Sequence, residues 1–123
     1  MSGTPEPPIL GISRAEAARI LGIRELSVTR LVRQGVLHKP AKDQRFALDL
    51  AEVEQLALER YHPGHPYWMS TGEAAELLGV TPTRVRQLVA RGFVPAVAQE
   101  GRSYFRRHQL EVIANARQSR KLR

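Results

Sequence analysis

An internal repeat constrains this chain more than any other feature of its sequence. Residues 13–60 align with residues 70–117 at a constant offset of 57, without a gap, and 15 of the 48 aligned positions are identical. The identities fall together on helix caps, glycines and apolar positions, which chance similarity would not select. The sequence therefore predicts a tandem duplication of one small structural unit.

Each copy opens with two short helices joined across a glycine. A Ser-x-x-Glu capping box starts the first helix, and a glycine suited to a left-handed C-terminal position ends it. The second helix carries apolar residues at i, i+3 and i+4 and ends at another glycine. These residues are Ser13, Glu16, Gly22, Val28, Leu31, Val32 and Gly35 in the first copy, and Ser70, Glu73, Gly79, Val85, Leu88, Val89 and Gly92 in the second. This arrangement is typical of a helix-turn-helix.

A two-stranded wing and a third helix are expected to complete each copy. The strands are predicted at 36–37 and 45–48 in the first copy and at 93–95 and 102–105 in the second; the third helix buries Leu50, Val53, Leu56 and Ala57, or Leu110, Ile113 and Ala114. The predicted fold is mainly α, with two tandem winged helix-turn-helix units at 13–60 and 70–117. A flexible segment at 1–12, a linker at 61–69 and a basic tail at 118–123 make up the rest.

The motif in both copies resembles a known family. It reads Glu-Ala-Ala-x-x-Leu-Gly, then Val-x-x-Leu-Val and Gly, with an arginine in the wing, and it is similar to the MerR-like or excisionase-like winged helix-turn-helix. The resemblance covers roughly 80% of the chain. It implies a bacterial or phage DNA-binding protein, either a transcription regulator or a recombination directionality factor that bends DNA. The long dimerisation helix and the effector domain of full-length MerR regulators are missing, and we expect the second repeat to replace a dimer partner.

The second helix of repeat 2 is the predicted DNA-reading element. At 100° per residue, Thr83, Gln87 and Arg91 point away from the apolar face, and Arg84 and Arg86 flank them. The N-terminal part of such a helix reaches base edges in the major groove, where arginine pairs with guanine and glutamine with adenine. The alternative is that these side chains form a solvated helix face.

Further candidate contacts lie at the helix start and in the wing of repeat 2. Thr81 begins the helix, where amide groups and the helix dipole favour a phosphate. The resemblance implies a DNA contact for Arg102, because the family usually carries an arginine in the wing. Arg106 and Arg107 are expected to extend the same positive strip.

Repeat 1 is a weaker candidate for reading bases. Arg24 and Glu25 replace the Thr-Pro start of the equivalent helix, so a carboxylate lies where a phosphate should approach. Residues 1–62 contain 9 basic and 8 acidic residues, whereas residues 63–123 contain 10 and 4. We therefore expect repeat 2 to be the principal DNA-binding unit. Repeat 1 either contacts a weaker half-site, which we favour, or serves for packing and protein contact; its candidate DNA contacts are Arg30, Arg33 and Arg45.

The segment between the repeats combines helix-breaking residues with aromatic ones. Two prolines and a glycine prevent a helix there. Tyr61, Tyr67 and Trp68 are expected to pack between the two units and fix their relative orientation, and a stacking platform for single-stranded bases is the alternative. His62-x-x-His65 could supply half of a metal site, but no cysteine or acidic cluster completes it, so no metal is expected.

Composition limits the remaining classes of function. The 19 basic residues against 12 acidic ones give a formal charge of +7, and 16 of the 19 are arginine, which suits phosphates and guanine edges. The absence of cysteine excludes a disulfide scaffold and a thiolate metal site. No apolar run approaches the roughly 20 residues of a membrane span, and no signal peptide is visible. No catalytic motif or cofactor motif is found, so we expect a cytoplasmic, nucleoid-associated protein that is not an enzyme.

Together these observations predict a sequence-specific protein that binds double-stranded DNA at sites resembling direct repeats. RNA polymerase and an integrase are candidate protein partners, and self-association on DNA is compatible with the sequence. The alternative is a protein-interaction module on a helix-turn-helix scaffold, with little DNA affinity of its own. The outward position expected for Leu26 and the near-neutral first repeat keep that alternative open.

Overall fold

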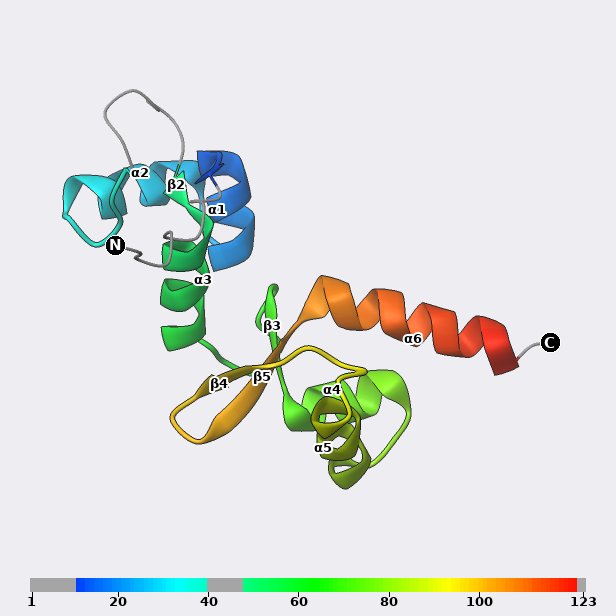
Figure 1. The fold of residues 1–123 in the computed structure, drawn as a ribbon. Helices are drawn as coiled ribbons and strands as arrows, with labels where there is room; N and C mark the ends of the chain where they lie inside the picture. Colours follow the sequence, from blue (N-terminus) through cyan, green and yellow to red (C-terminus); the bar gives the residue numbers. More distant parts are fainter. Residues whose placement is uncertain (1–10, 40–47, 122–123) are drawn as a thin grey trace, which may run out of the picture. The chain divides into compact units, whose positions relative to one another are not determined.

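The computed structural model describes residues 11–39 and 48–121, with the side chains of residues 120 and 121 excepted. Its contacts divide the chain into two compact units, unit 1 (Met1–Glu59) and unit 2 (Arg60–Arg123). The described part of unit 1 contains β1 (Gly11–Ile12), α1 (Arg14–Leu21), α2 (Glu25–Arg33), β2 (Leu48–Asp49) and α3 (Leu50–Glu59) (Figure 1). Unit 2 contains β3 (Trp68–Ser70), α4 (Thr71–Leu78), α5 (Pro82–Ala90), β4 (Val97–Gln99), β5 (Arg102–Arg106) and α6 (Arg107–Lys121).

Unit 1 is a helix-turn-helix closed by a third helix. Val28, Val53 and Ala57 are fully buried where α1 contacts α2 and α3. Gly22 ends α1 with a φ of 70°, in the left-handed region that glycine adopts without a steric penalty. The predicted capping box is only half formed: the Ser13 hydroxyl accepts the Glu16 N–H at 3.1 Å, and the Glu16 side chain is exposed.

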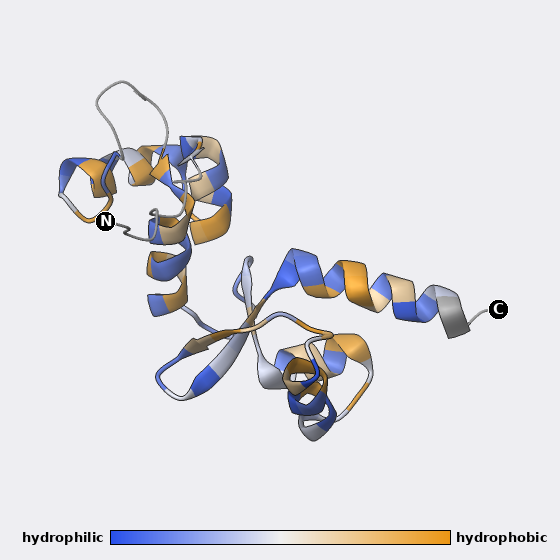
Figure 2. Ribbon diagram, in the orientation of Figure 1, coloured by the Kyte–Doolittle hydropathy of each residue, from blue (hydrophilic) through white to orange (hydrophobic). Residues whose placement is uncertain are grey.

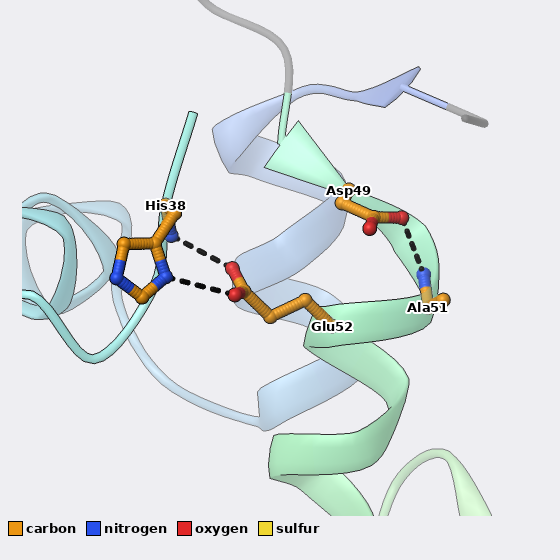
Figure 3. A network of polar contacts seen from close by, with 4 residues as sticks. All are labelled: His38, Asp49, Ala51 and Glu52. Carbon is orange, nitrogen blue, oxygen red and sulfur yellow. Dashed lines mark hydrogen bonds and ion pairs between the residues drawn. The ribbon is translucent and has the colours of Figure 1, made fainter. Parts of the chain in front are cut away.

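A polar network fixes the start of α3 in unit 1 (Figure 3). The Glu52 carboxylate accepts the backbone N–H of His38 at 2.7 Å and contacts His38 Nδ1 at 2.9 Å. Asp49 Oδ1 accepts the Ala51 N–H at 3.0 Å, so this side chain satisfies one of the unpaired amides of the first turn. The network links the segment after α2 to α3, across residues 40–47, which lie outside the described part of the chain.

Unit 2 adds a three-stranded antiparallel sheet to the same helical arrangement, with strand order β3-β5-β4. Its core combines Phe105 from the sheet with Val85 from α5, Ala74 from α4 and Leu110 from α6. Alternation along β5 places Phe105 in this core and Tyr104 on the opposite face. In Figure 2 the start of α6 has the colour of hydrophilic residues. Along its middle, hydrophilic and hydrophobic colours alternate, as expected of a helix with one buried face.

Each described element of unit 1 corresponds to an element of unit 2 at the offset of 57 residues. α4 and α5 have the bounds of α1 and α2 moved by 57, and α6 begins 57 residues after α3. The strand register agrees as well, since Ile12 pairs with Leu48 and Met69 pairs with Phe105. The structural repeat therefore begins two residues earlier than the sequence alignment, at Gly11 and at Trp68.

Several predicted boundaries differ from the structure because strand pairing sets them. Gly11–Ile12, placed by the sequence in a flexible segment, pair with β2, whereas residues 1–10 lie outside the described range. Trp68–Ser70, partly assigned to the linker, pair with β5 and belong to unit 2. The expected strands at 36–37 and 93–95 were wrong: Leu37 and Val94 are buried but do not lie in strands, and the first wing strand of unit 2 is β4, four residues later than 93–95. Helix α6 continues to Lys121, through most of the predicted tail.

Candidate nucleic-acid interface

Helix α5 begins and ends where its sequence signals predict. The Thr81 hydroxyl accepts the Arg84 N–H at 3.2 Å, and Pro82 occupies the first helical position, where its missing N–H is no loss. Val85 and Leu88 are buried in the core of unit 2. Gly92 follows the last turn with a φ of 78°. The helix is therefore held by one apolar face and by a capped N-terminus, and its other faces are available to solvent.

The outward face of α5 carries the polar side chains expected to read DNA. Thr83, Gln87 and Arg91 are exposed, in agreement with the predicted orientation. Arg84 is half-buried beside α6, and its Nη1 donates to Gln87 Oε1 at 3.1 Å. This bond holds a guanidinium and an amide side by side, which are the groups that pair with guanine and adenine edges. Their contact with DNA stays a prediction.

The wing of unit 2 is the hairpin formed by β4 and β5. Gln99 pairs with Arg102, so the hairpin closes through two residues, Glu100 and Gly101. Their φ values are 50° and 78°, which is the conformation of the two-residue turns that match the twist of a hairpin. Arg102 directly follows this turn and is exposed. The turn chemistry therefore places the wing arginine at the end of the hairpin.

A pocket of about 500 Å³ lies between the wing and the two helices of the helix-turn-helix. Arg86 lines it from α5, Arg102 lines it from β5, and the first turn of α4 contributes Thr71 and Gly72. Tyr104 lines it from the sheet. The structure thus brings together two predicted DNA contacts, Arg86 and Arg102, which are 16 residues apart in the sequence. Sequence reasoning missed the contribution of α4, although a glycine in the first turn of a helix was a visible signal.

Arg106 and Arg107 have structural contacts that the expected positive strip did not include. The Arg106 guanidinium lies over the Trp68 ring, 5.2 Å from its centroid, in a cation–π contact. Arg107 Nη2 donates to the carbonyl oxygen of His65 at 2.7 Å, and its backbone N–H donates to the carbonyl of Tyr67 at 2.8 Å. Arg107 therefore attaches the segment 61–67 to the start of α6, and Arg106 contacts β3.

The segment expected to lie between the units is built into unit 2. The Glu73 carboxylate, which completes the capping box of α4, also accepts the Gly64 N–H at 3.0 Å and the Tyr61 hydroxyl. Burial raises the pKa of Glu73, but the bonds from Tyr61, Ser70 and Gly64 outweigh it and hold the pKa below its usual value. The Tyr61 ring lies 5.1 Å from the Tyr104 ring, centroid to centroid. These contacts explain why the segment is ordered without helix or strand.

His65 has a structural position in this segment. Its side chain is 1% exposed, and its Nδ1 accepts the N–H groups of Tyr67 and Trp68 at 3.0 and 3.1 Å. An Nδ1 that accepts two amides places the proton on Nε2, which is buried and has no hydrogen-bond partner among the described residues. Within the described ranges no three His, Cys, Asp or Glu side chains gather as metal ligands would.

The candidate contacts of unit 1 are only partly described. Arg30 and Arg33 are exposed on α2, and Arg45 lies outside the described residues. Arg24 occupies the N-cap position, and no side chain within the described ranges caps this helix. Leu26, at the position equivalent to Thr83, is 72% exposed. The outward face of α2 is thus less polar than that of α5.

Net charge is concentrated in unit 2. Unit 1 contains 8 basic and 8 acidic residues over Met1–Glu59, a net charge of 0. Unit 2 contains 11 basic and 4 acidic residues over Arg60–Arg123, a net charge of +7. Attraction to a polyanion is therefore a property of unit 2, in which the capped α5 and the wing also lie.

The fold of unit 2, two short helices joined at Gly79 and followed by a hairpin wing, defines the helix-turn-helix class of DNA-binding domains. Residues 68–118 match the family model described as "Helix-turn-helix domain", which runs from the start of β3 into α6. The match lies within unit 2 and supports DNA binding by this unit, and the helix-turn-helix family is typically non-enzymatic. Searches among curated proteins and among solved structures found no match to the chain.

None of the helices within residues 11–39 and 48–121 is both long enough and apolar enough to cross a lipid bilayer.

Proposed function

We propose that this protein binds double-stranded DNA in a sequence-specific manner and that unit 2 is its principal reader. In this proposal α5 enters the major groove, where Thr83, Arg84 and Gln87 contact base edges. Thr81 and Arg102 contact the phosphates on either side, and Arg91 lies at the end of the same face. Unit 1 binds a weaker half-site through α2.

The observation that carries the proposal is the combination of α5 and the wing. A capped helix exposes Thr83, Gln87 and Arg91 on one face, and Arg102 follows the turn of the adjacent hairpin. The unit that contains them has a net charge of +7 and includes the residues that match the helix-turn-helix model. A solvated helix face would require neither the wing arginine nor this concentration of charge.

The repeat bears on the kind of site that is recognised. If the two units pack with translational instead of two-fold symmetry, they can meet successive major grooves head to tail, about one helical turn apart. We therefore propose sites that resemble direct repeats instead of palindromes. Self-association on longer DNA fits the same head-to-tail geometry.

The cellular role that we propose is a transcription regulator or a recombination directionality factor in the bacterial or phage cytoplasm. Both roles need the same DNA-binding unit, and the second adds DNA bending, whose cost wing and phosphate contacts would offset. RNA polymerase is the partner expected for the regulator, and an integrase is the partner expected for the directionality factor. Proximity of the gene to an integrase gene would favour the second role.

The proposal is tested by affinity selection from a random duplex DNA pool, followed by titration of the enriched site. Two spaced half-sites in direct orientation would support reading by both units, and a single half-site would limit reading to unit 2. The affinity of wild-type protein should fall steeply between about 50 and 200 mM salt, because phosphate contacts release counterions.

The double variant Arg84→Ala, Arg86→Ala should lose specific binding to the enriched site. Arg19→Ala, Arg60→Ala is the matched control, because it removes the same charge from two exposed positions outside the candidate site. Full affinity in the first variant would remove the site assignment. If no sequence is enriched and little DNA is retained at moderate salt, the DNA-binding proposal fails.

The second candidate function is a protein-interaction module. The exposed Leu26 on α2 and the neutral charge of unit 1 favour it, because both suit an apolar protein contact better than DNA. An interface of that kind would change little with salt, which separates it from DNA binding.

A further inference from the structure

We propose that the pocket between α4, α5 and the wing of unit 2 holds one phosphate group of the DNA backbone. This inference rests on the proposed function and deepens it, because it separates the residue that anchors the backbone from those that read bases. It assigns Arg86 to the phosphate and leaves Arg84 and Gln87 for base edges.

Two guanidinium groups from different elements line the pocket. Arg86 comes from α5 and Arg102 from the start of β5, and both residues are exposed, so their charge is accessible from solvent. Thr71 and Tyr104, which carry hydroxyl groups, line the same space. Arginine forks and hydroxyl groups are the side chains that most often bind phosphate oxygens in DNA complexes. Their convergence favours a tetrahedral anion over a flat base.

The first turn of α4 leaves room for such a group. A Cβ at Gly72 would have only the Ser70 hydroxyl within 4 Å, at 3.9 Å, so the fold itself would accept a larger residue. The equivalent residue in unit 1 is Ala15, in the first turn of α1. Glycine is a poor residue for a helix, and its use where the fold does not require it is typical of close approach by a ligand.

The equivalent positions in unit 1 show that this place retains an arginine in both units. There Arg14 occupies the position of Thr71, Thr29 occupies that of Arg86, and Arg14 Nη1 donates to Thr29 Oγ1 at 2.9 Å. Arginine and threonine have thus exchanged helices between the units, and in unit 2 both residues line the same pocket. Core packing alone would not require a charged side chain at this place in both units.

The proposal predicts different defects for neighbouring arginines. Loss of a phosphate anchor weakens binding to all sequences alike, whereas loss of a base contact relaxes the preference at one base pair. Arg86→Ala should therefore lower affinity about tenfold for both the enriched site and a scrambled duplex. Arg84→Ala should lower affinity mainly for the enriched site.

The direct test uses the full chain and enriched duplexes in which one backbone phosphate at a time is replaced by an uncharged methylphosphonate. The variants are Arg86→Ala, Gly72→Gln and, as the matched control on the exposed side of α4, Leu77→Gln. Melting temperatures of all variants are measured first, and Gly72→Ala provides a milder change at the same place. Affinities are compared with wild type on each duplex.

We expect one phosphate position per half-site of unit 2 at which neutralisation lowers wild-type affinity about tenfold. At that position, Arg86→Ala and Gly72→Gln should cause little further loss, because the contact is already gone. Leu77→Gln should behave as wild type throughout. The pocket would be overturned if Gly72→Gln bound DNA as tightly as Leu77→Gln. It would also be overturned if the loss of affinity from Arg86→Ala added in full to the loss from neutralisation at every phosphate position. Either result would leave specific DNA binding intact. Absence of any enriched site would overturn both.

Discussion

His65 makes a pH-dependent contribution to the stability of unit 2. Its buried Nδ1 accepts two backbone amides, which only the ring with an unprotonated Nδ1 can do. Burial, together with the charges of His62 and Arg107, lowers the pKa of His65. The attachment of segment 61–67 to β3 therefore depends on a neutral histidine.

We expect unit 2 to lose stability as the pH falls below about 6.5, the ordinary pKa of histidine. The unfolded chain binds a proton there while the folded chain resists it, so stability present above that pH is lost as the pH decreases. The loss is at most about 1.4 kcal/mol per pH unit. Urea unfolding between pH 7.5 and 5.5 measures it. His108→Gln, a control at an exposed histidine of α6, should keep the slope, and His65→Asn should reduce it; an unchanged slope in His65→Asn would contradict the assignment.

Among the secondary-structure elements, the wing contains a turn residue with an unfavourable backbone conformation. Glu100 has a φ of 50°, in the left-handed region that residues other than glycine and asparagine rarely adopt. Its carboxylate also lies two residues before Arg102, on the hairpin proposed to contact phosphate. Glu100 is therefore unfavourable for the backbone conformation of the turn, and its negative charge is unfavourable for the proposed contact of the wing with phosphate.

Glu100→Asn should stabilise unit 2 by about 0.5 to 1 kcal/mol, because asparagine tolerates the left-handed conformation and forms this turn type with the following glycine. Loss of the acidic charge should also raise DNA affinity at low salt. Glu100→Gln separates the two effects, since it removes the charge without relieving the backbone. It should raise affinity but not the melting temperature. Equal melting temperatures for the Asn and Gln variants would show that the turn is unstrained.

On the scale of the whole molecule, the two copies have kept their helices and diverged in chemistry. The bounds of the first two helices and the start of the third agree at an offset of 57, but net charge is 0 in unit 1 and +7 in unit 2. Helix α5 is capped by Thr81, whereas α2 begins at Glu25 after Arg24, without a side-chain cap from the described residues. Duplication thus preserved the packing faces and left the exposed faces to change.

If unit 1 binds a weaker half-site, Arg30→Ala, Arg33→Ala should lower affinity severalfold for a direct-repeat site and leave affinity for a single unit 2 half-site unchanged. Each lost phosphate contact should also reduce the slope of log affinity against log salt by about 1. Fluorescence anisotropy with the two duplexes measures both quantities. Equal affinity of this variant and wild type for the direct-repeat site would assign unit 1 to protein contact instead.

Features that depend on neighbouring residues along the chain could be predicted from the amino-acid sequence. The caps at Ser70 and Thr81, the helix ends at Gly79 and Gly92, and the buried face through Val85 all follow from local backbone chemistry and helical periodicity. The repeat supports these predictions, because the sequence contains two copies of each predicted helix. The orientation of α5 was predictable for that reason.

Features that depend on contacts between residues far apart in the sequence could not be predicted in this way. Strand register placed β3 beside β5 and moved the first wing strand from 93–95 to 97–99, because backbone hydrogen bonding and the burial of Val94 outweighed the local apolar pattern. The same folding joined Gly72, Arg86 and Arg102 around one pocket. No local sequence signal predicts that α4, α5 and the wing lie around one pocket, because their arrangement depends on how the sheet packs against the helices.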